Sequence, residues 1–445
     1  MSLLQNYCKL LSKTMNTIPY RYFKDELSNG LRVITVEMPY VHAAEIALYV
    51  RVGSRYETIE NNGISHFLEH MFFRGSHHYP SSFQINEAFE LIGEGLIANT
   101  FREFTCFWSK IDSQFLDKGM SLFGDVFRSP IFEEIETERK IVHIELLEDF
   151  DSEGEPLDMD NVSRPFLWPG HSLGFSVIGT KENINKFTRD DIISHYEKHF
   201  VASNMVLCVS GLVTRDEVLE SSKKYFGDFN TGKLIYPSPL LMSQEFPLSK
   251  FIYAESSKVD IQLSFRAYGE THPDIKTLYL IQRVLDDGIS SRLQKSVCEE
   301  QGLAYDISAA LDCYSDIGVF DIDVSVPPEK TFSVLLAILD ELKLLKEKGI
   351  TIEELEKVKS RGIREYEFHF DHLRQMSIQF GEGELLYGLK TPEECMQDIT
   401  QISLEDIKRC AEDVFDSKNF NLVVLGPYTL QQQRDMKELL RSQPI

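Results

Sequence analysis

The first half of the chain alternates between two spacings of hydrophobic residues. Residues 31–39 (LRVITVEMP) and 44–54 (AEIALYVRVGS) are rich in β-branched side chains and alternate in part between apolar and polar positions, which predicts two strands. Residues 61–75 (NNGISHFLEHMFFRG) predict a helix that is bounded by Gly63 and Gly75.

The segments that follow continue this mixture of strands and helices. Residues 83–93 predict a helix that stops at a glycine, and residues 96–111 alternate like a single strand. Residues 115–129 predict a helix that Pro130 ends, and residues 133–150 predict a long helix whose acidic start suits the helix dipole. The mixture predicts an α+β fold in which a mostly antiparallel sheet packs helices on one face.

The two halves of the chain end in the same motif. FTRDDIISHYEKHFVASNMVLCVSG (187–211) aligns without a gap with ISLEDIKRCAEDVFDSKNFNLVVLG (402–426). Each copy predicts an amphipathic helix, a short turn that contains asparagine, and an apolar strand that ends in glycine. Identical pairs include Asp191/Asp406, Asn204/Asn419 and Gly211/Gly426.

This repeat predicts two homologous domains. The first covers residues 20–232, a connector that contains proline covers 233–250, and the second domain covers 251–445. Residues 1–19 are interpreted as a short amphipathic arm, because their leucines form no continuous apolar core and no cleavage site of a secretory signal follows them.

The balance of charge excludes two classes of partner. The chain carries 46 basic and 70 acidic residues, a formal net charge of −24. A nucleic-acid-binding protein needs a basic face, and adsorption to an anionic membrane needs basic segments. No glycine-rich phosphate-binding loop follows a predicted strand, so a nucleotide binder has no support either.

The cysteines indicate a reducing compartment. The seven cysteines are scattered, odd in number and free of any C-x-x-C pair, which predicts small buried hydrophobic residues rather than disulfides or a cysteine zinc site. We therefore expect a cytoplasmic protein with no membrane span, and the same pattern leaves the mitochondrial matrix open.

The candidate chemistry lies in the segment His66-Phe67-Leu68-Glu69-His70. Residues i and i+4 of a helix share one face, so His66 and His70 can present two imidazole nitrogens to one ion. Glu69 points to nearly the same side and can activate a water molecule beside the ion. The alternative interpretation is a helix with two ordinary histidines.

A catalytic zinc ion needs a third protein ligand. The predicted helix at 133–150 offers Glu138, Glu145 and Glu148. Glu138 and Glu145 lie two helical turns apart and share a face, so Glu145 can complete the ligand set while Glu138 supports a histidine N–H. Manganese or cobalt in place of zinc stays open.

These residues resemble a known family. The inverted H-x-x-E-H motif and its distant glutamate are similar to those of the inverzincin metallopeptidases of the pitrilysin and mitochondrial-processing-peptidase group. Blocks of that group recur in order along nearly the whole chain. They are NGLRVITVEMP, VGSRYETIENNGISHFLEHMFFRGS, ERKIVHIELLEDF, HSLGFSVIGTKENI, SNMVLCVSG and QGLAYDISA.

The resemblance implies two homologous α/β roll domains that enclose a chamber, as in the half-length members that pair into homodimers or heterodimers. It implies a zinc ion held by His66, His70 and Glu145, with Glu69 as base and Glu138 as its support. It also implies substrate contacts from Ala98, in the strand that binds the peptide, and from Tyr305. These positions are His66, Glu69, His70, Ala98, Glu138, Glu145 and Tyr305.

Two positions depart from the family pattern. Cys298 stands where the family has a substrate-binding arginine, seven residues before Tyr305, and Ile97 replaces an asparagine before Ala98. Arg292 is off register. One hypothesis is a division of labour, in which this chain bears the zinc and a homologous partner supplies the Arg/Tyr pair.

Two function classes therefore compete. The first is a zinc metalloendopeptidase that cleaves peptides or unstructured segments inside a chamber too small for folded proteins. The second is a catalytically weak or inactive core subunit of an assembly, which the missing arginine keeps open. The complete set of ligands and base favours the first.

Overall fold

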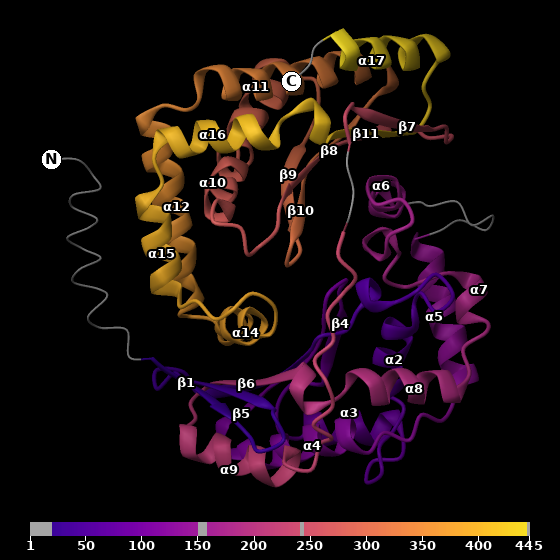
Figure 1. Cartoon of the computed structure of the whole chain (residues 1–445), viewed down its shortest axis with the longest axis vertical. Helices are drawn as coiled ribbons and strands as arrows, with labels where there is room; N and C mark the ends of the chain where they lie inside the picture. The colour runs from indigo at the N-terminus through magenta and orange to yellow at the C-terminus, as the bar shows by residue number, and fades with distance from the viewer. Residues whose placement is uncertain (1–19, 150–157, 241–243, 443–445) are drawn as a thin grey trace, which may run out of the picture. The chain divides into compact units, whose positions relative to one another are not determined.

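A computed structural model describes residues 20–149, 158–240 and 244–442 of the chain (Figure 1). The described residues form two compact units that exchange segments. The first unit is built from residues within Met1–Leu157, Trp168–Pro239 and Glu367–Pro392, and the second from those within Asp158–Leu167, Leu240–Tyr366 and Glu393–Ile445. The domain boundaries inferred from the repeat stay a prediction.

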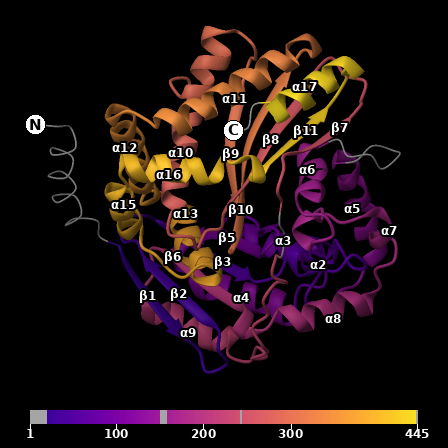
Figure 2. The ribbon, with the colours of Figure 1, turned by 45° about the horizontal axis from the view of Figure 1, so that its top comes forward.

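The first unit is built on a six-stranded mixed sheet in the order β1-β2-β6-β3-β5-β4. All neighbouring pairs are antiparallel except β2 and β6, which run parallel. Figure 2 shows β1 and β2 at one edge. The strands are β1 (Arg21–Glu26), β2 (Arg32–Glu37), β3 (Ala43–Val50), β4 (Ile97–Thr100), β5 (Thr105–Asp112) and β6 (Met205–Gly211).

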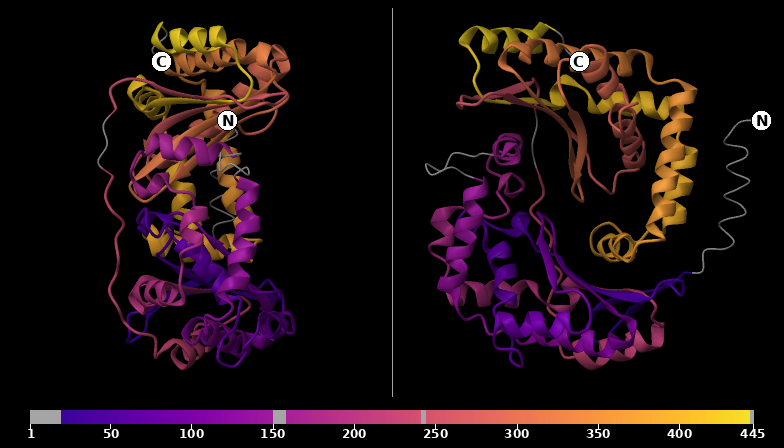
Figure 3. Two further views of the ribbon diagram at one scale, coloured as in Figure 1. Left: turned by 90° about the vertical axis from the view of Figure 1, so that its right-hand side faces the viewer. Right: turned by 180° about the vertical axis from the view of Figure 1, so that it is seen from behind.

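Helices pack against one face of this sheet and enclose an aromatic core (Figure 3). The Phe72 ring is fully buried among five other rings, including Phe107, Phe127 and Phe200. The helices of the unit are α2 (Ile64–Phe72), α3 (Ser82–Glu90), α4 (Leu116–Arg128), α5 (Ile135–Asp149), α7 (Lys181–Ile184), α8 (Arg189–His199) and α9 (Arg215–Phe226).

The opposite face of the same sheet carries a strap, Leu373–Leu386, from the second half of the chain. It contains α13 (Leu373–Ser377), a π-helical turn (Ile378–Glu382) and α14 (Gly383–Leu386). The Tyr49 hydroxyl lies 3.0 Å from Ser377 Oγ. The strap approaches closely at Gly381, where an added Cβ would lie 2.4 Å from the Tyr49 ring. The strap therefore adds short helical segments to the face of the sheet opposite the main helical layer.

The second unit repeats the architecture of the first. Its sheet order, β7-β11-β8-β10-β9, corresponds to β2-β6-β3-β5-β4, and the parallel pair recurs as β7 and β11. The repeated motif forms α8 and β6 in one unit and α16 and β11 in the other, with Thr188/Asp191 and Ser403/Asp406 as matching capping boxes. This agreement supports duplication.

The other elements of the second unit complete this pattern, and Figure 2 shows its strands side by side. Its strands are β7 (Leu248–Ile252), β8 (Val259–Tyr268), β9 (Ile307–Cys313), β10 (Ile317–Val326) and β11 (Phe420–Leu425). The helices are α10 (Ile275–Leu285), a π-helix (Gln294–Glu300), α11 (Thr331–Lys348), α12 (Ile352–His369), α15 (Pro392–Gln401), α16 (Leu404–Val414) and α17 (Leu430–Ser442).

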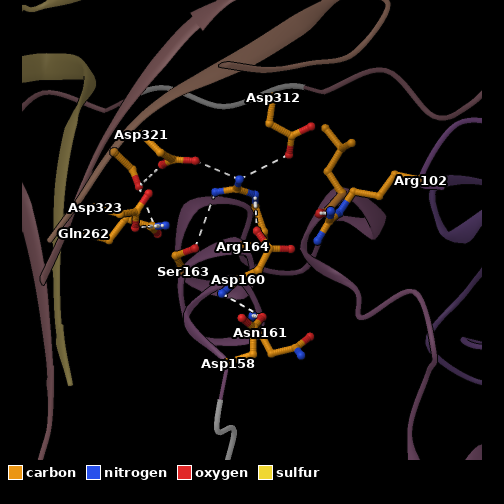
Figure 4. A network of polar contacts seen from close by, with 12 residues as sticks. Arg102, Asp158, Asp160, Asn161, Ser163, Arg164, Gln262, Asp312, Asp321 and Asp323 are labelled. Atoms are coloured by element: carbon orange, nitrogen blue, oxygen red, sulfur yellow. Dashed lines mark hydrogen bonds and ion pairs between the residues drawn. The ribbon is translucent and has the colours of Figure 1, made fainter. Parts of the chain in front are cut away.

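The second sheet also receives a segment from the first half of the chain. Helix α6 (Met159–Leu167) contacts β8 and β11, and its Arg164 is buried. The Arg164 guanidinium lies 2.8 Å from Asp321, 3.0 Å from Asp160 and 3.2 Å from Asp312 (Figure 4). Burial opposes the charge of Arg164, but these carboxylates outweigh it and raise its pKa.

The prediction of a single strand over 96–111 is wrong. The segment forms a hairpin of β4 and β5, in which Phe101 N donates to Phe104 O at 2.8 Å to close the turn. The chain alternates apolar and polar residues on both sides of this turn, so the pattern alone did not reveal the reversal. No helix among the described residues is long and apolar enough to cross a bilayer.

Candidate metal centre

Helix α2 presents His66, Glu69 and His70, and its start is fixed by a buried carboxylate. Glu57 accepts hydrogen bonds from Gly63 N and Ser65 N, each at 2.8 Å, and so caps amides that have no partner inside the helix. Gly63 has φ +98°, and a Cβ there would lie 2.5 Å from Ile178 O. Glycine at this position therefore lets the helix begin close to the 178–179 backbone.

Three side chains from two helices converge. His66 Nε2 and His70 Nε2 lie 3.3 Å apart, Glu145 Oε1 lies 3.4 Å from His66 Nε2, and Glu145 Oε2 lies 3.3 Å from His70 Nε2. Tetrahedral zinc with bonds of about 2.0–2.1 Å sets its ligand atoms about 3.3 Å apart. These residues are the one group of potential metal ligands found within the described parts of the chain, and they fit a zinc ion.

A second carboxylate orients His70. Glu138 is 2% exposed, and its Oε1 lies 2.6 Å from His70 Nδ1, while Arg74 donates to its other oxygen. The Nδ1–H of His70 is therefore held by Glu138, and Nε2 faces the convergence point. Burial raises the pKa of Glu138, but the hydrogen bonds from His70 and Arg74 outweigh it and lower that pKa.

The group stabilises positive charge at its centre. Hydrogen bonds from His66 and His70 lower the pKa of Glu145. Burial alone would lower the pKa of His70, but its hydrogen bonds to Glu138 and Glu145 raise it to about 9. Two ionised carboxylates thus flank two imidazoles, which is an arrangement that favours a cation.

Glu69 lies beside this group and is 8% exposed. The Thr100 hydroxyl donates a hydrogen bond of 2.6 Å to Glu69 Oε2, so strand β4 contacts helix α2 through this pair. Sequence reasoning missed this contact and the role of Arg74. Helix α2 ends at Phe72, so Arg74 lies just beyond it. Its position four residues after His70 in the predicted helix 61–75 was a usable signal for the second.

Strand β4 forms one edge of the first sheet and pairs only with β5 among the described residues. Ile97 and Asn99 are exposed, while Ala98 packs partly against the helix-side core. The predicted substrate residue Ala98 therefore lies on a strand whose outer edge can accept an added strand.

The remaining predicted residues belong to the second unit. Tyr305 is fully exposed in the second unit, where Cys298 lies in the π-helix at Gln294–Glu300. Arg292 is paired with Glu354 at 2.7 Å and Glu341 at 3.3 Å. The role of Tyr305 stays a prediction.

Two family models match the chain in succession. Residues 32–181 match a model described as insulinase (peptidase family M16), and residues 186–361 match one described as the peptidase M16 inactive domain. A protein of Rickettsia felis, named an uncharacterized zinc protease, is 30% identical over 412 residues, which cover 91% of this chain and 98% of that protein. A protein of Bacillus subtilis, also named an uncharacterized zinc protease, is 29% identical over 90% of this chain and 97% of its own length.

Solved structures share the fold. A protease from Helicobacter pylori superposes with a TM-score of 0.85 at 23% identity and covers 92% of this chain and 100% of its own. A peptidase M16 inactive domain from Pseudomonas fluorescens superposes with a TM-score of 0.83 at 17% identity, over 92% of this chain and 99% of its own. The two mixed sheets packed with helices are therefore a fold found in other proteins.

Proposed function

The chain belongs to peptidase family M16, and on this premise we propose that it is a zinc-dependent endopeptidase whose metal ligands are His66, His70 and Glu145. The convergence of these three side chains carries the proposal. The names of the relatives support zinc peptidase chemistry at the level of the family.

Each polar residue of the centre has a role in this proposal. A zinc ion held by His66, His70 and Glu145 would supply Lewis-acid chemistry, which activates water and polarises a carbonyl group. Glu69 takes a proton from the water that attacks and later delivers it to the leaving amine. Glu138 holds His70 in the tautomer that presents Nε2, and Arg74 holds Glu138.

The substrate class follows from the open edge of β4. We propose that an extended peptide adds to this edge, with main-chain hydrogen bonds to the strand that contains Ala98. A peptide or an unfolded segment can present an extended, unpaired backbone in this way. The cleaved molecules are therefore peptides or unstructured segments, held in an enclosed chamber with Tyr305 as a further contact.

We also propose that this chain is the zinc-bearing subunit of a dimer. Cys298 occupies the position of the family arginine, and a thiol cannot replace the fork of donors that a guanidinium offers. A homologous partner that supplies an Arg/Tyr pair would complete the site. Full activity of the isolated homodimeric protein would contradict this part of the proposal.

The experiment that tests the function compares wild type with Glu69→Gln. We expect the zinc-loaded wild type to cleave a peptide library, alone or with a homologous partner, and chelation to abolish cleavage. Glu69→Gln should bind zinc as before and lose about 10²-fold to 10⁴-fold in kcat. The competing structural-subunit function predicts no cleavage by the wild type under any of these conditions.

A further inference from the structure

The tip of the β4–β5 hairpin, at the edge of the first sheet, is anchored to residues 53–55 by several contacts. Arg55 N donates to Arg102 O at 2.9 Å, and the buried Arg55 guanidinium lies 2.6 Å from Glu103 Oε1. The backbones approach so closely that a Cβ on Gly53 would lie 2.0 Å from Phe101 O. The hairpin tip is therefore held against residues 53–55 by backbone packing and by a buried ion pair.

This anchor fixes the position of Thr100, the last residue of β4. Thr100 pairs with Thr105 across the hairpin, next to the closed turn. Alternation along the strand places Thr100 on the same face as Ala98, which packs toward the helices. Threonine is stiff at χ1 because it is β-branched, so a fixed backbone also restricts its hydroxyl.

Thr100 donates its single hydroxyl proton in a hydrogen bond to Glu69. Thr100 Oγ1 lies 2.6 Å from Glu69 Oε2 and 3.4 Å from Thr105 Oγ1. Thr105 in turn donates to Val52 O at 2.9 Å, so its own proton is used elsewhere. A carboxylate accepts a hydroxyl hydrogen bond strongly, and the shorter contact is the one to Glu69.

We propose that Thr100 is a positioning residue that holds Glu69 in the orientation needed for catalysis. The proposal rests on the function assigned to Glu69 above. Strand β4, which is proposed to bind the peptide, thus also orients Glu69, the proposed general base. Addition of a peptide to the open edge of β4 makes main-chain hydrogen bonds along this strand, so substrate binding and orientation of the base are coupled.

The kinetic test compares Thr100→Val, which removes the hydroxyl at nearly constant shape, with Thr100→Ser, which keeps it. We expect Thr100→Val to lower kcat about 10-fold to 100-fold, with KM within about twofold and zinc binding unchanged. Thr100→Ser should recover most of the loss. Ser109→Ala is the matched control, because it removes a buried hydroxyl of the same hairpin that donates to Glu94 O at 2.8 Å.

A structural comparison tests, independently of activity, whether Thr100 positions Glu69. Crystal structures of the zinc-loaded wild type and Thr100→Val should show the Glu69 carboxylate bonded to Thr100 in the first and displaced or disordered in the second. If the wild type cleaves no peptide, the proposed function fails while this comparison still tests Thr100. An unmoved Glu69, an unchanged kcat in Thr100→Val, or a Thr100→Ser variant as weak as Thr100→Val would overturn the inference.

Discussion

The contact between His70 and Glu138 makes a prediction about metal affinity. Glu138 Oε1 lies 2.6 Å from His70 Nδ1. Glu138→Gln keeps the shape of the side chain but removes the negative charge beside this nitrogen. We expect zinc affinity to fall about 10-fold to 100-fold, because a carboxylate behind a ligand histidine raises its basicity and fixes its tautomer. Competition with a chromophoric chelator measures this loss.

A matched control lies on the same helix. Glu136 is in the first turn of α5 and pairs with Arg139 at the surface. Glu136→Gln removes the same charge without touching a histidine, so zinc affinity should stay at the wild-type value. Equal losses in the two variants would indicate a general effect of charge and contradict the specific role of Glu138.

Two buried histidines predict how stability depends on pH. Burial lowers the pKa of His195 and lowers that of His199 to about 3. In the unfolded chain both titrate near 6.5, so below that pH the unfolded state binds protons that the native state refuses. Stability should fall as pH decreases from 6.5, by up to about 1.4 kcal/mol per histidine and pH unit.

Urea denaturation of the zinc-free protein at pH 7.5 and pH 5.5 measures this dependence. His199→Leu removes one of the titrating groups, and the metal ligands titrate equally in both proteins. The variant should therefore lose less stability than the wild type between the two values. An identical loss in both proteins would show that His199 does not titrate in this range on unfolding.

At the residue scale, the sequence was sufficient to predict which side chains lie together wherever helical spacing determines their geometry. His66 and His70 share a face because of the helical period, and Glu138 and Glu145 share another for the same reason. Thr100 was not identifiable in this way. It meets Glu69 only because the hairpin turns back at 101–104, and no local spacing encodes a contact between these elements.

Among the elements, the strap makes a sharp prediction at Gly381. A Cβ at this position would lie 2.4 Å from the fully buried Tyr49 ring and 2.9 Å from Cys208 Cβ. Gly381→Ala should therefore destabilise the first unit by about 1–3 kcal/mol through overpacking. Chemical denaturation followed by tryptophan fluorescence is a suitable measurement, because Arg374 of the strap stacks on Trp108.

The strap also contains its own control. Gly383 lies at the start of α14, and its Cβ would meet nothing nearer than Gly388 O at 4.0 Å. Gly383→Ala should be neutral or stabilising by about 0.5–1 kcal/mol, because alanine loses less backbone entropy in a helix. Destabilisation of the same size in both variants would contradict close packing at Gly381.

Element types were easier to predict than element partners. Most helices of the first unit begin and end near the predicted residues, because glycine, proline and acidic residues mark those ends. The reversal inside 96–111 and the strap were missed for one reason. Both depend on where a segment packs. The hydrophobic pattern of an amphipathic segment shows which of its faces is buried, but it does not show which sheet the segment packs against.

For the whole molecule, the internal repeat predicted two homologous architectures, and the matched order of the two sheets agrees with it. The exchange of segments was not predictable from that repeat. Helix α6 comes from the first half of the chain and packs in the second unit, and the strap does the reverse. Homology reports how a domain arose, whereas packing decides which residues stabilise it.

Variants of Arg164 allow the contribution of α6 to the stability of the second unit to be measured as a free energy of unfolding. Arg164 enters the second unit on α6 and pairs with Asp321, which is 4% exposed and whose pKa burial raises despite the arginine. Arg164→Met should cost about 3–5 kcal/mol, because it leaves a buried carboxylate without its cation. Asp321→Asn alone should also destabilise, since it leaves the guanidinium short of a partner.

The double variant separates a specific pair from a general loss of packing. If Arg164 and Asp321 act together, the combined cost of Arg164→Met and Asp321→Asn should fall well below the sum of the single costs. Denaturant unfolding of all four proteins gives this coupling energy. Additive costs would mean that Arg164 and Asp321 contribute to stability independently of each other. A coupling of 1 kcal/mol or more (roughly the range for contacting residues) would mean that a residue from the first half of the sequence stabilises the second unit through this ion pair.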